Sequence, residues 1–129
     1  MSANFINVDL EIESPEPLDH ICCELIEAGA FKLYNGESKG GFLASFEVED
    51  GRSGSDPNSI ITTFCDMLSC LDERSLKTWH DAHRKTFDLG YEADNTIGSF
   101  HSDLKNQVLR RVAELGIDVR LTLYPKSPS

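Results

Sequence analysis

Apolar and polar residues alternate along several segments of the chain at the two-residue period of a β-strand. The clearest of these segments are residues 4–13, 42–49, 85–92 and 117–124. Because successive side chains of a strand point to opposite faces, each segment is predicted to bury its apolar set and expose its polar set. The pattern therefore predicts a sheet with one face covered and the other in contact with water.

Segments with apolar residues at helical spacing lie between the predicted strands. Their expected bounds are 17–29, 60–71, 72–84 and 100–115. Pro17 is typical of a helix start, and Gly29 and Gly116 are typical of positions just past a helix end. A short strand is expected at 31–34, and the Gly- and Ser-rich residues 35–41 predict a hairpin leading into the strand 42–49.

These elements predict an α+β fold: a single domain over residues 1–129, with a mostly antiparallel sheet of four or five strands and helices packed on one face. The length suits one hydrophobic core. Residues 50–59 are expected to form a flexible loop and residues 125–129 a disordered tail. One apolar residue per main element is expected in the core: Leu10, Leu25, Phe46, Phe64, Leu89, Val112 and Leu121.

The formal net charge of −10 limits the classes of partner. Nucleic acid and anionic membranes are not expected, because binding to phosphates requires lysine and arginine. No apolar run approaches the roughly 20 residues of a membrane-spanning helix. The sequence begins without the basic and apolar regions of a secretory signal, so we expect a cytoplasmic protein whose four cysteines are reduced.

The side chains that the alternation places on the exposed face of the predicted sheet are mostly acidic. Its carboxylates are Asp9, Glu11, Glu13, Glu47, Glu49, Asp88, Glu92 and Asp118, against the single Arg120. One interpretation is a solvated surface that keeps the protein soluble. The other is a binding surface for a basic protein partner, which would relieve the repulsion between carboxylates and associate quickly. The nearly uniform sign of the charge favours the second interpretation.

Motifs for catalysis, cofactors or metal do not accompany this surface. His80 and His83 lie three residues apart, but the sequence shows no further ligands at the spacing of a zinc site, and His20 and His101 have no companion motif. The Gly-rich stretches match neither a P-loop nor a dinucleotide fingerprint. We therefore assign no catalytic, cofactor-binding or metal-ligating residue and expect chelators to leave folding unchanged. A hydrolase site assembled from distant residues stays open.

Two stretches carry a family resemblance: Trp79-His-Asp-Ala-His-Arg84-Lys-Thr-Phe87-Asp88-Leu-Gly90-Tyr-Glu92, and Leu115-Gly116 followed by Leu121-Thr-Leu-Tyr124-Pro125. Residues 79–125, about a third of the chain, resemble small acidic α+β proteins of bacteria that are of the immunity type or uncharacterised. This resemblance implies an immunity protein for a secreted toxin. Together with the acidic surface, it predicts a non-enzymatic protein that neutralises a basic, nuclease-like toxin. The alternative is a small regulatory α+β module that binds a metabolite or pairs with itself.

Overall fold

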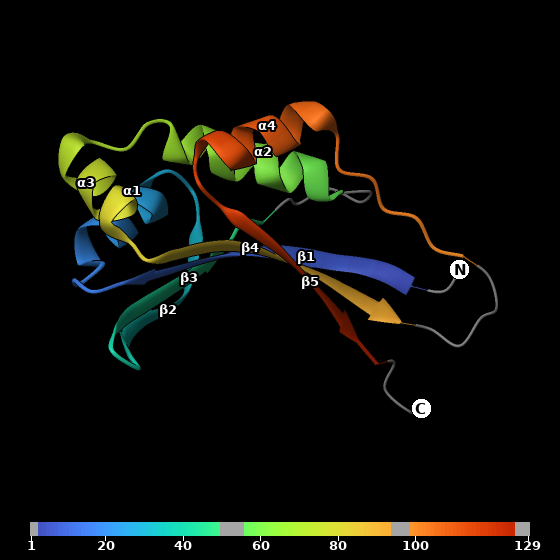
Figure 1. The fold of residues 1–129 in the computed structure, drawn as a ribbon, viewed down its shortest axis with the longest axis horizontal. Helices are drawn as coiled ribbons and strands as arrows, with labels where there is room; N and C mark the ends of the chain where they lie inside the picture. Colours follow the sequence, from blue (N-terminus) through green and yellow to red (C-terminus); the bar gives the residue numbers. More distant parts are fainter. Residues whose placement is uncertain (1–2, 50–55, 94–98, 126–129) are drawn as a thin grey trace.

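A computed structural model describes residues 3–49, 56–93 and 99–125. Within these residues the chain forms a five-stranded sheet in the order β2-β3-β1-β4-β5, with helices along one side (Figure 1). The elements in chain order are β1 (Ala3–Ser14), α1 (Asp19–Glu27), β2 (Phe31–Ser38), β3 (Gly41–Glu47), α2 (Pro57–Leu68), α3 (Glu73–Asp81), β4 (Arg84–Ala93), α4 (Asn106–Glu114) and β5 (Asp118–Tyr124).

The first strand, β1, is the centre of the sheet. It pairs antiparallel with β3 on one side and with β4 on the other. The predicted hairpin is present as β2 and β3, although β2 extends to Ser38 and the turn contains only Lys39 and Gly40. Gly40 has a φ of 76°, a conformation that side chains disfavour. Among the strands of the described residues only β4 and β5 pair in parallel, so the α+β fold with a mostly antiparallel sheet is confirmed.

The apolar phase of the strands faces the helices and forms the core, as the alternation predicts. Val8, Leu10 and Ile12 of β1 are each at most 1% exposed. Six of the seven residues expected in the core are buried, namely Leu10, Leu25, Phe46, Phe64, Leu89 and Val112. The two-residue period therefore located the buried face of the three central strands correctly.

The expectation for Leu121 is wrong: its side chain is 67% exposed. Its phase is correct, because the parallel register places Leu121 beside the buried Leu89 of β4 and therefore on the helical side of the sheet. However, β5 is an edge strand, and Figure 1 shows it running out beyond the helical layer. Leu123 is similarly exposed, at 63%. Periodicity reveals the face that a side chain is on, but not whether a helix covers it.

Helix boundaries also differ from the sequence expectation. Asp56 caps α2 by accepting hydrogen bonds from the backbone N–H groups of Asn58 and Ser59, and Pro57 occupies the first turn. Residues 57–59 are therefore helical and do not belong to the loop expected at 50–59, whose residues 50–55 lie outside the described part. The last helix, α4, begins at Asn106. The expectation of a helix over residues 100–105 is therefore wrong. Of the expected tail, residues 126–129 also lie outside the described residues.

Trp79 connects the helical layer to the sheet. Its indole N–H donates a hydrogen bond of 3.0 Å to the carbonyl of Leu115, just after α4. The ammonium group of Lys85, on β4, lies 5.1 Å from the centre of the indole ring and donates to the Trp79 carbonyl. Trp79 is 2% exposed, so its indole N–H finds its hydrogen-bond acceptor within the protein. The contacts of Trp79 also hold α3 against α4 and β4.

The contrast between Phe46 and Leu121 gives a prediction for stability. Phe46→Ala should lower the free energy of unfolding by about 3–5 kcal/mol, because it leaves a cavity in the core. Leu121→Ala should lower it by less than about 1 kcal/mol, because most of that side chain is already in water. Urea denaturation of the two variants and the wild-type protein measures both values. A similar loss for both variants would contradict the exposed position of Leu121.

Candidate functional site on the open face of the sheet

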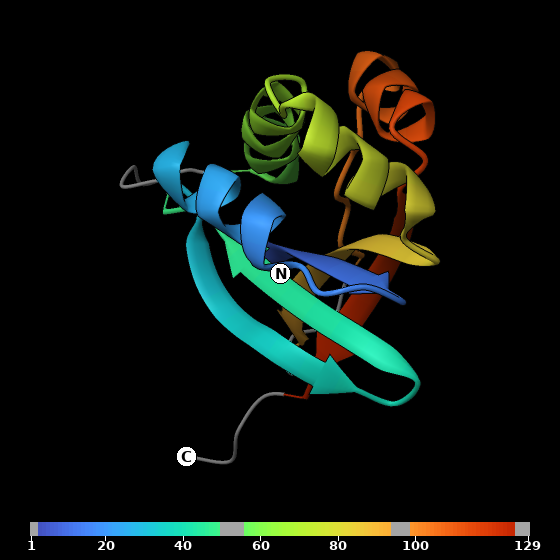
Figure 2. The same cartoon turned by 90° about the vertical axis from the view of Figure 1, so that its left-hand side faces the viewer.

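The open face of the sheet is the face without helices. Figure 2 shows the helices gathered on the opposite side of the strands. The register places Asp9 of β1 opposite Asp88 of β4, with Glu11 opposite Thr86 and Glu13 opposite Arg84. Carboxylates from neighbouring strands are therefore side by side on this face, as the alternation predicts.

Two arginines bind the carboxylates on the β4 and β5 side of this face. Arg84 contacts Glu13 and donates a hydrogen bond of 3.0 Å to Glu11. Arg120 bridges Glu11, at 2.8 Å, and Asp88, at 3.0 Å. The hydrogen bonds that Arg120 donates to Asp88 and Glu11 raise its pKa, so it carries its charge at any physiological pH. Glu11 thus joins the two arginines in one continuous network.

The open face is less negative than the sequence predicts, because Arg84 belongs to it. The expected strand began at residue 85, whereas β4 begins at Arg84 and directs this side chain to the same face as Glu13. Three of the predicted partner-binding carboxylates are therefore already paired, namely Glu11, Glu13 and Asp88. Within the described residues no basic side chain makes an ion pair with the others, which are Asp9, Glu47, Glu49, Glu92 and Asp118.

The predicted carboxylates do not form one uniform patch. Asp9 on β1 and Glu47 on β3 are close enough for Glu47 to affect the ionisation of Asp9. Glu92 lies near the far end of β4, beside Asn4 and Tyr124, and Asp118 is at the start of the edge strand β5. Glu49 is exposed and follows the end of β3. We therefore define the acidic centre as Asp9 and Glu47, and the ionic network as Glu11, Glu13, Asp88, Arg84 and Arg120.

Asp9 is the most perturbed acid on this face. Burial, followed by the negative charges of Glu47, Asp88 and Glu11, raises its pKa to about 6. Its described polar contact is a hydrogen bond of 3.2 Å from the side-chain amide of Asn7. A carboxylate in this position is costly to ionise and would gain from a nearby positive charge.

An apolar hollow of about 330 Å³ lies on the other side of the sheet, where β5 is uncovered. Its lining consists of Leu89, Tyr91, Phe100, Ser102, Leu104, Leu121, Thr122 and Leu123. The hydroxyl groups of Tyr91 and Ser102 share a hydrogen bond of 2.7 Å, and they are the polar groups that the hollow brings together. Sequence reasoning missed this feature because it expected a helix over residues 100–105.

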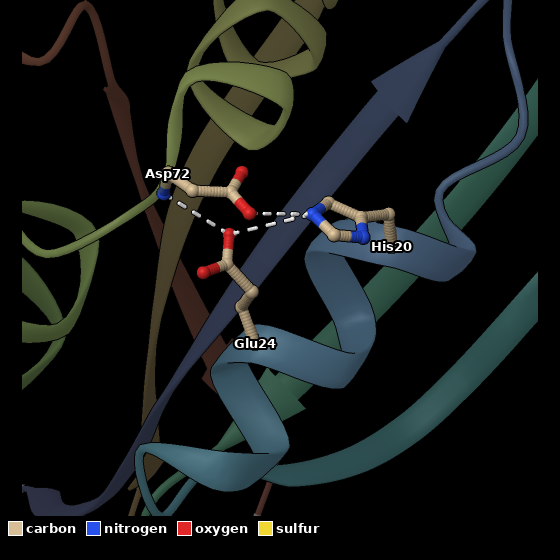
Figure 3. Close-up of side chains that lie close together, drawn as sticks. All are labelled: His20, Glu24 and Asp72. Atoms are coloured by element: carbon tan, nitrogen blue, oxygen red, sulfur yellow. Dashed lines mark hydrogen bonds and ion pairs between the residues drawn. The ribbon is translucent and has the colours of Figure 1, made fainter.

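A third group of polar side chains connects two helices. His20 and Glu24 lie one turn apart on α1, and Asp72 caps the start of α3 (Figure 3). Hydrogen bonds from the Ser75 backbone N–H and from His20 lower the pKa of Asp72 to about 2, so this carboxylate is ionised at neutral pH. The i, i+4 spacing of His20 and Glu24 was the available sequence signal. The histidines considered from spacing, His80 and His83, are both exposed and do not belong to this group.

Comparison of the chain with protein-family models, with curated proteins and with solved structures gives no match.

The raised pKa of Asp9 gives a prediction for stability against pH. The folded protein holds this proton more tightly than the unfolded chain, whose value is near 3.8. The stabilising contribution of Asp9 to the free energy of unfolding is therefore fully present below about pH 4 and is lost as the pH rises through about 6. Asp9→Asn cannot ionise, so its melting temperature should exceed that of the wild-type protein above pH 6, and the difference should shrink towards pH 4.

Thermal melts of both proteins between pH 4 and 8 measure this difference. Asp118→Asn is the control, because it removes an exposed carboxylate at the sheet edge and should shift stability by less than about 0.5 kcal/mol. Parallel pH profiles for Asp9→Asn and the wild-type protein would show that Asp9 is not held in a crowded acidic environment.

Proposed function

We propose that this protein is a non-enzymatic binding protein of the immunity type, which neutralises a basic, nuclease-like toxin in the bacterial cytoplasm. The observation that carries this proposal is the acidic centre on the open face of the sheet. There, Asp9 and Glu47 are crowded together without a helix to cover them, and Asp9 has a pKa of about 6. A cationic side chain docked at this position would supply a positive charge that the described residues do not place in an ion pair with Asp9 or Glu47.

The ionic network next to the acidic centre supports binding in a different way. Arg84 and Arg120 hold Glu11 from both sides, and Arg120 also holds Asp88. Pre-ordered carboxylates lose little conformational entropy on binding, and the arginine pairs limit the cost of self-repulsion in the free protein. The partner therefore meets a rigid surface whose most negative point is offset from the network towards β3.

The mechanism would be occlusion. A nuclease binds phosphates through lysines and arginines, and the acidic centre would occupy those same groups and exclude the nucleic acid. The net charge of −10 would attract such a toxin over a distance and increase the association rate. The resemblance of residues 79–125 to immunity-type proteins supports the same conclusion.

The cytoplasmic location is part of this proposal. No helix in the described part of the chain is long and apolar enough to cross a membrane. The cysteines of this part that lie on the surface, Cys23 and Cys70, are unpaired, which fits a reducing compartment.

A second candidate function follows from the apolar hollow beside β5. A cavity of about 330 Å³ with a Tyr91–Ser102 hydroxyl pair suits a small apolar metabolite that carries one hydrogen-bonding group. This candidate corresponds to the regulatory module considered from the sequence. Leu121→Asp would place a charge in the hollow and should abolish metabolite binding, while leaving toxin binding through the open face unchanged.

A charge-matched pair of variants tests the proposed function. Asp9→Asn combined with Glu47→Lys changes the net charge by one plus two units, from −10 to −7. Glu27→Gln combined with Glu114→Lys makes the same change at exposed positions on α1 and α4. Any basic, nuclease-like domain found to be encoded directly upstream of this gene is the partner for the test, first in a growth-rescue assay and then in stopped-flow association.

The acidic-centre variant should fail to rescue growth. At low salt it should associate with the toxin domain more than about tenfold more slowly than the wild-type protein does, and this difference in association rate should be smaller at high salt. The helical control should rescue growth as the wild-type protein does. Rescue by the acidic-centre variant would refute the interface, and the absence of growth rescue by the wild-type protein would refute the immunity function.

A further inference from the structure

The group formed by His20, Glu24 and Asp72 lies in the helical layer, on the other side of the sheet from the acidic centre (Figures 1 and 3). The His20 Nε2 atom is 2.8 Å from the Asp72 Oδ2 atom and 3.9 Å from the Glu24 Oε1 atom. One nitrogen and one oxygen from each carboxylate all lie within 4.8 Å of one another. In Figure 3 the three side chains point toward a common centre.

Hydrogen bonds from backbone N–H groups hold the two carboxylates in place. The Oδ1 atom of Asp72 accepts a hydrogen bond of 2.8 Å from the Ser75 backbone N–H, which leaves its Oδ2 atom directed at His20. The backbone N–H of Asp72 donates to the Glu24 Oε1 atom at 3.2 Å. Each carboxylate is therefore positioned by a backbone group, an arrangement that orients ligands in metal sites.

The separations suit a small metal ion. Zinc binds imidazole nitrogen and carboxylate oxygen at about 2.0–2.2 Å, so tetrahedral ligand atoms lie about 3.4 Å apart. The two measured separations, 2.8 and 3.9 Å, are on either side of this value. Small side-chain rotations within the present backbone would therefore complete the coordination.

We propose that His20, Glu24 and Asp72 form a binding site for a divalent transition-metal ion of the zinc class. An imidazole ligand favours zinc over magnesium and calcium, which prefer oxygen ligands alone. The ion binds the lone pair of the His20 Nε2 atom, which faces Asp72, so any proton on that nitrogen passes to water and the ring carries its proton on Nδ1. Water fills the fourth position, since the side chain of Asp72 is half exposed. The bound ion connects α1 to α3. This inference replaces the expectation, from motif spacing alone, that the chain has no metal site.

The test must separate a metal site from an ion pair that only joins two helices. Glu24→Gln keeps an oxygen that accepts the Asp72 N–H, and Asp72→Asn keeps the helix cap and its bond to Ser75. Both variants should therefore fold while losing the charge that a metal requires. The exposed thiols Cys23 and Cys70 are replaced by serine in every protein, because thiols bind zinc on their own.

Isothermal titration of chelator-treated protein with Zn²⁺ should give one equivalent bound and a rise in melting temperature. His20→Ala, Glu24→Gln and Asp72→Asn should each weaken Zn²⁺ binding by more than about tenfold. The double variant His80→Ala, His83→Ala is the matched histidine control and should bind as its parent does. Titration with Co²⁺ should produce the visible absorption of a coordinated ion in the parent but not in His20→Ala.

Three results would overturn the proposal: no Zn²⁺ binding by the parent that lacks the exposed thiols, binding that survives His20→Ala, or binding that is lost in the control at His80 and His83. None of these results bears on the acidic centre, because the two sites share no residue.

Discussion

The alternation of side chains along β1 is the constraint on which both faces of the molecule depend. Since β1 pairs with β3 and β4, its Leu10 and Ile12 lie in the middle of the core, while Asp9 and Glu11 lie in the middle of the open face. A shift of the register by one residue would exchange these sets and bury carboxylates under the helices. The hydrophobic effect thus fixes the register, and the register in turn assembles the acidic centre from separate strands.

Local patterns in the sequence predicted most of the fold. The strand period predicted the face of every main strand, and Gly29 and Gly116 mark helix ends close to their observed positions. Two errors, at Leu121 and at residues 100–105, have one cause. A strand or helix pattern in the sequence shows which side of a segment is apolar. Whether another helix or strand packs on that side depends on the path of the chain between elements. For this reason, the apolar hollow beside β5 could not be predicted from periodicity.

The candidate sites were only partly predictable, for the same reason. The acidic side chains of β1 were located by their phase, but the pairing of Glu13 with Arg84 joins residues from distant parts of the chain. His20 and Asp72 are also far apart in sequence and meet only because α1 packs beside α3 (Figure 1). Spacing within one segment reveals a helical pair such as His20 and Glu24. It does not reveal the third residue, which tertiary packing supplies.

The central position of β1 has a consequence for how the chain folds. During synthesis β1 precedes β4, and the antiparallel ladder between them cannot form until the chain has been made beyond Ala93. Until then, only α1, α2 and α3 can cover the apolar side of β1, and the β2–β3 hairpin can pair with one of its edges while the other stays open. Ladders between distant segments close slowly because of their loop entropy. The nascent chain therefore passes through a stage with an unpaired strand edge, at which chaperones would act and at which aggregation would begin.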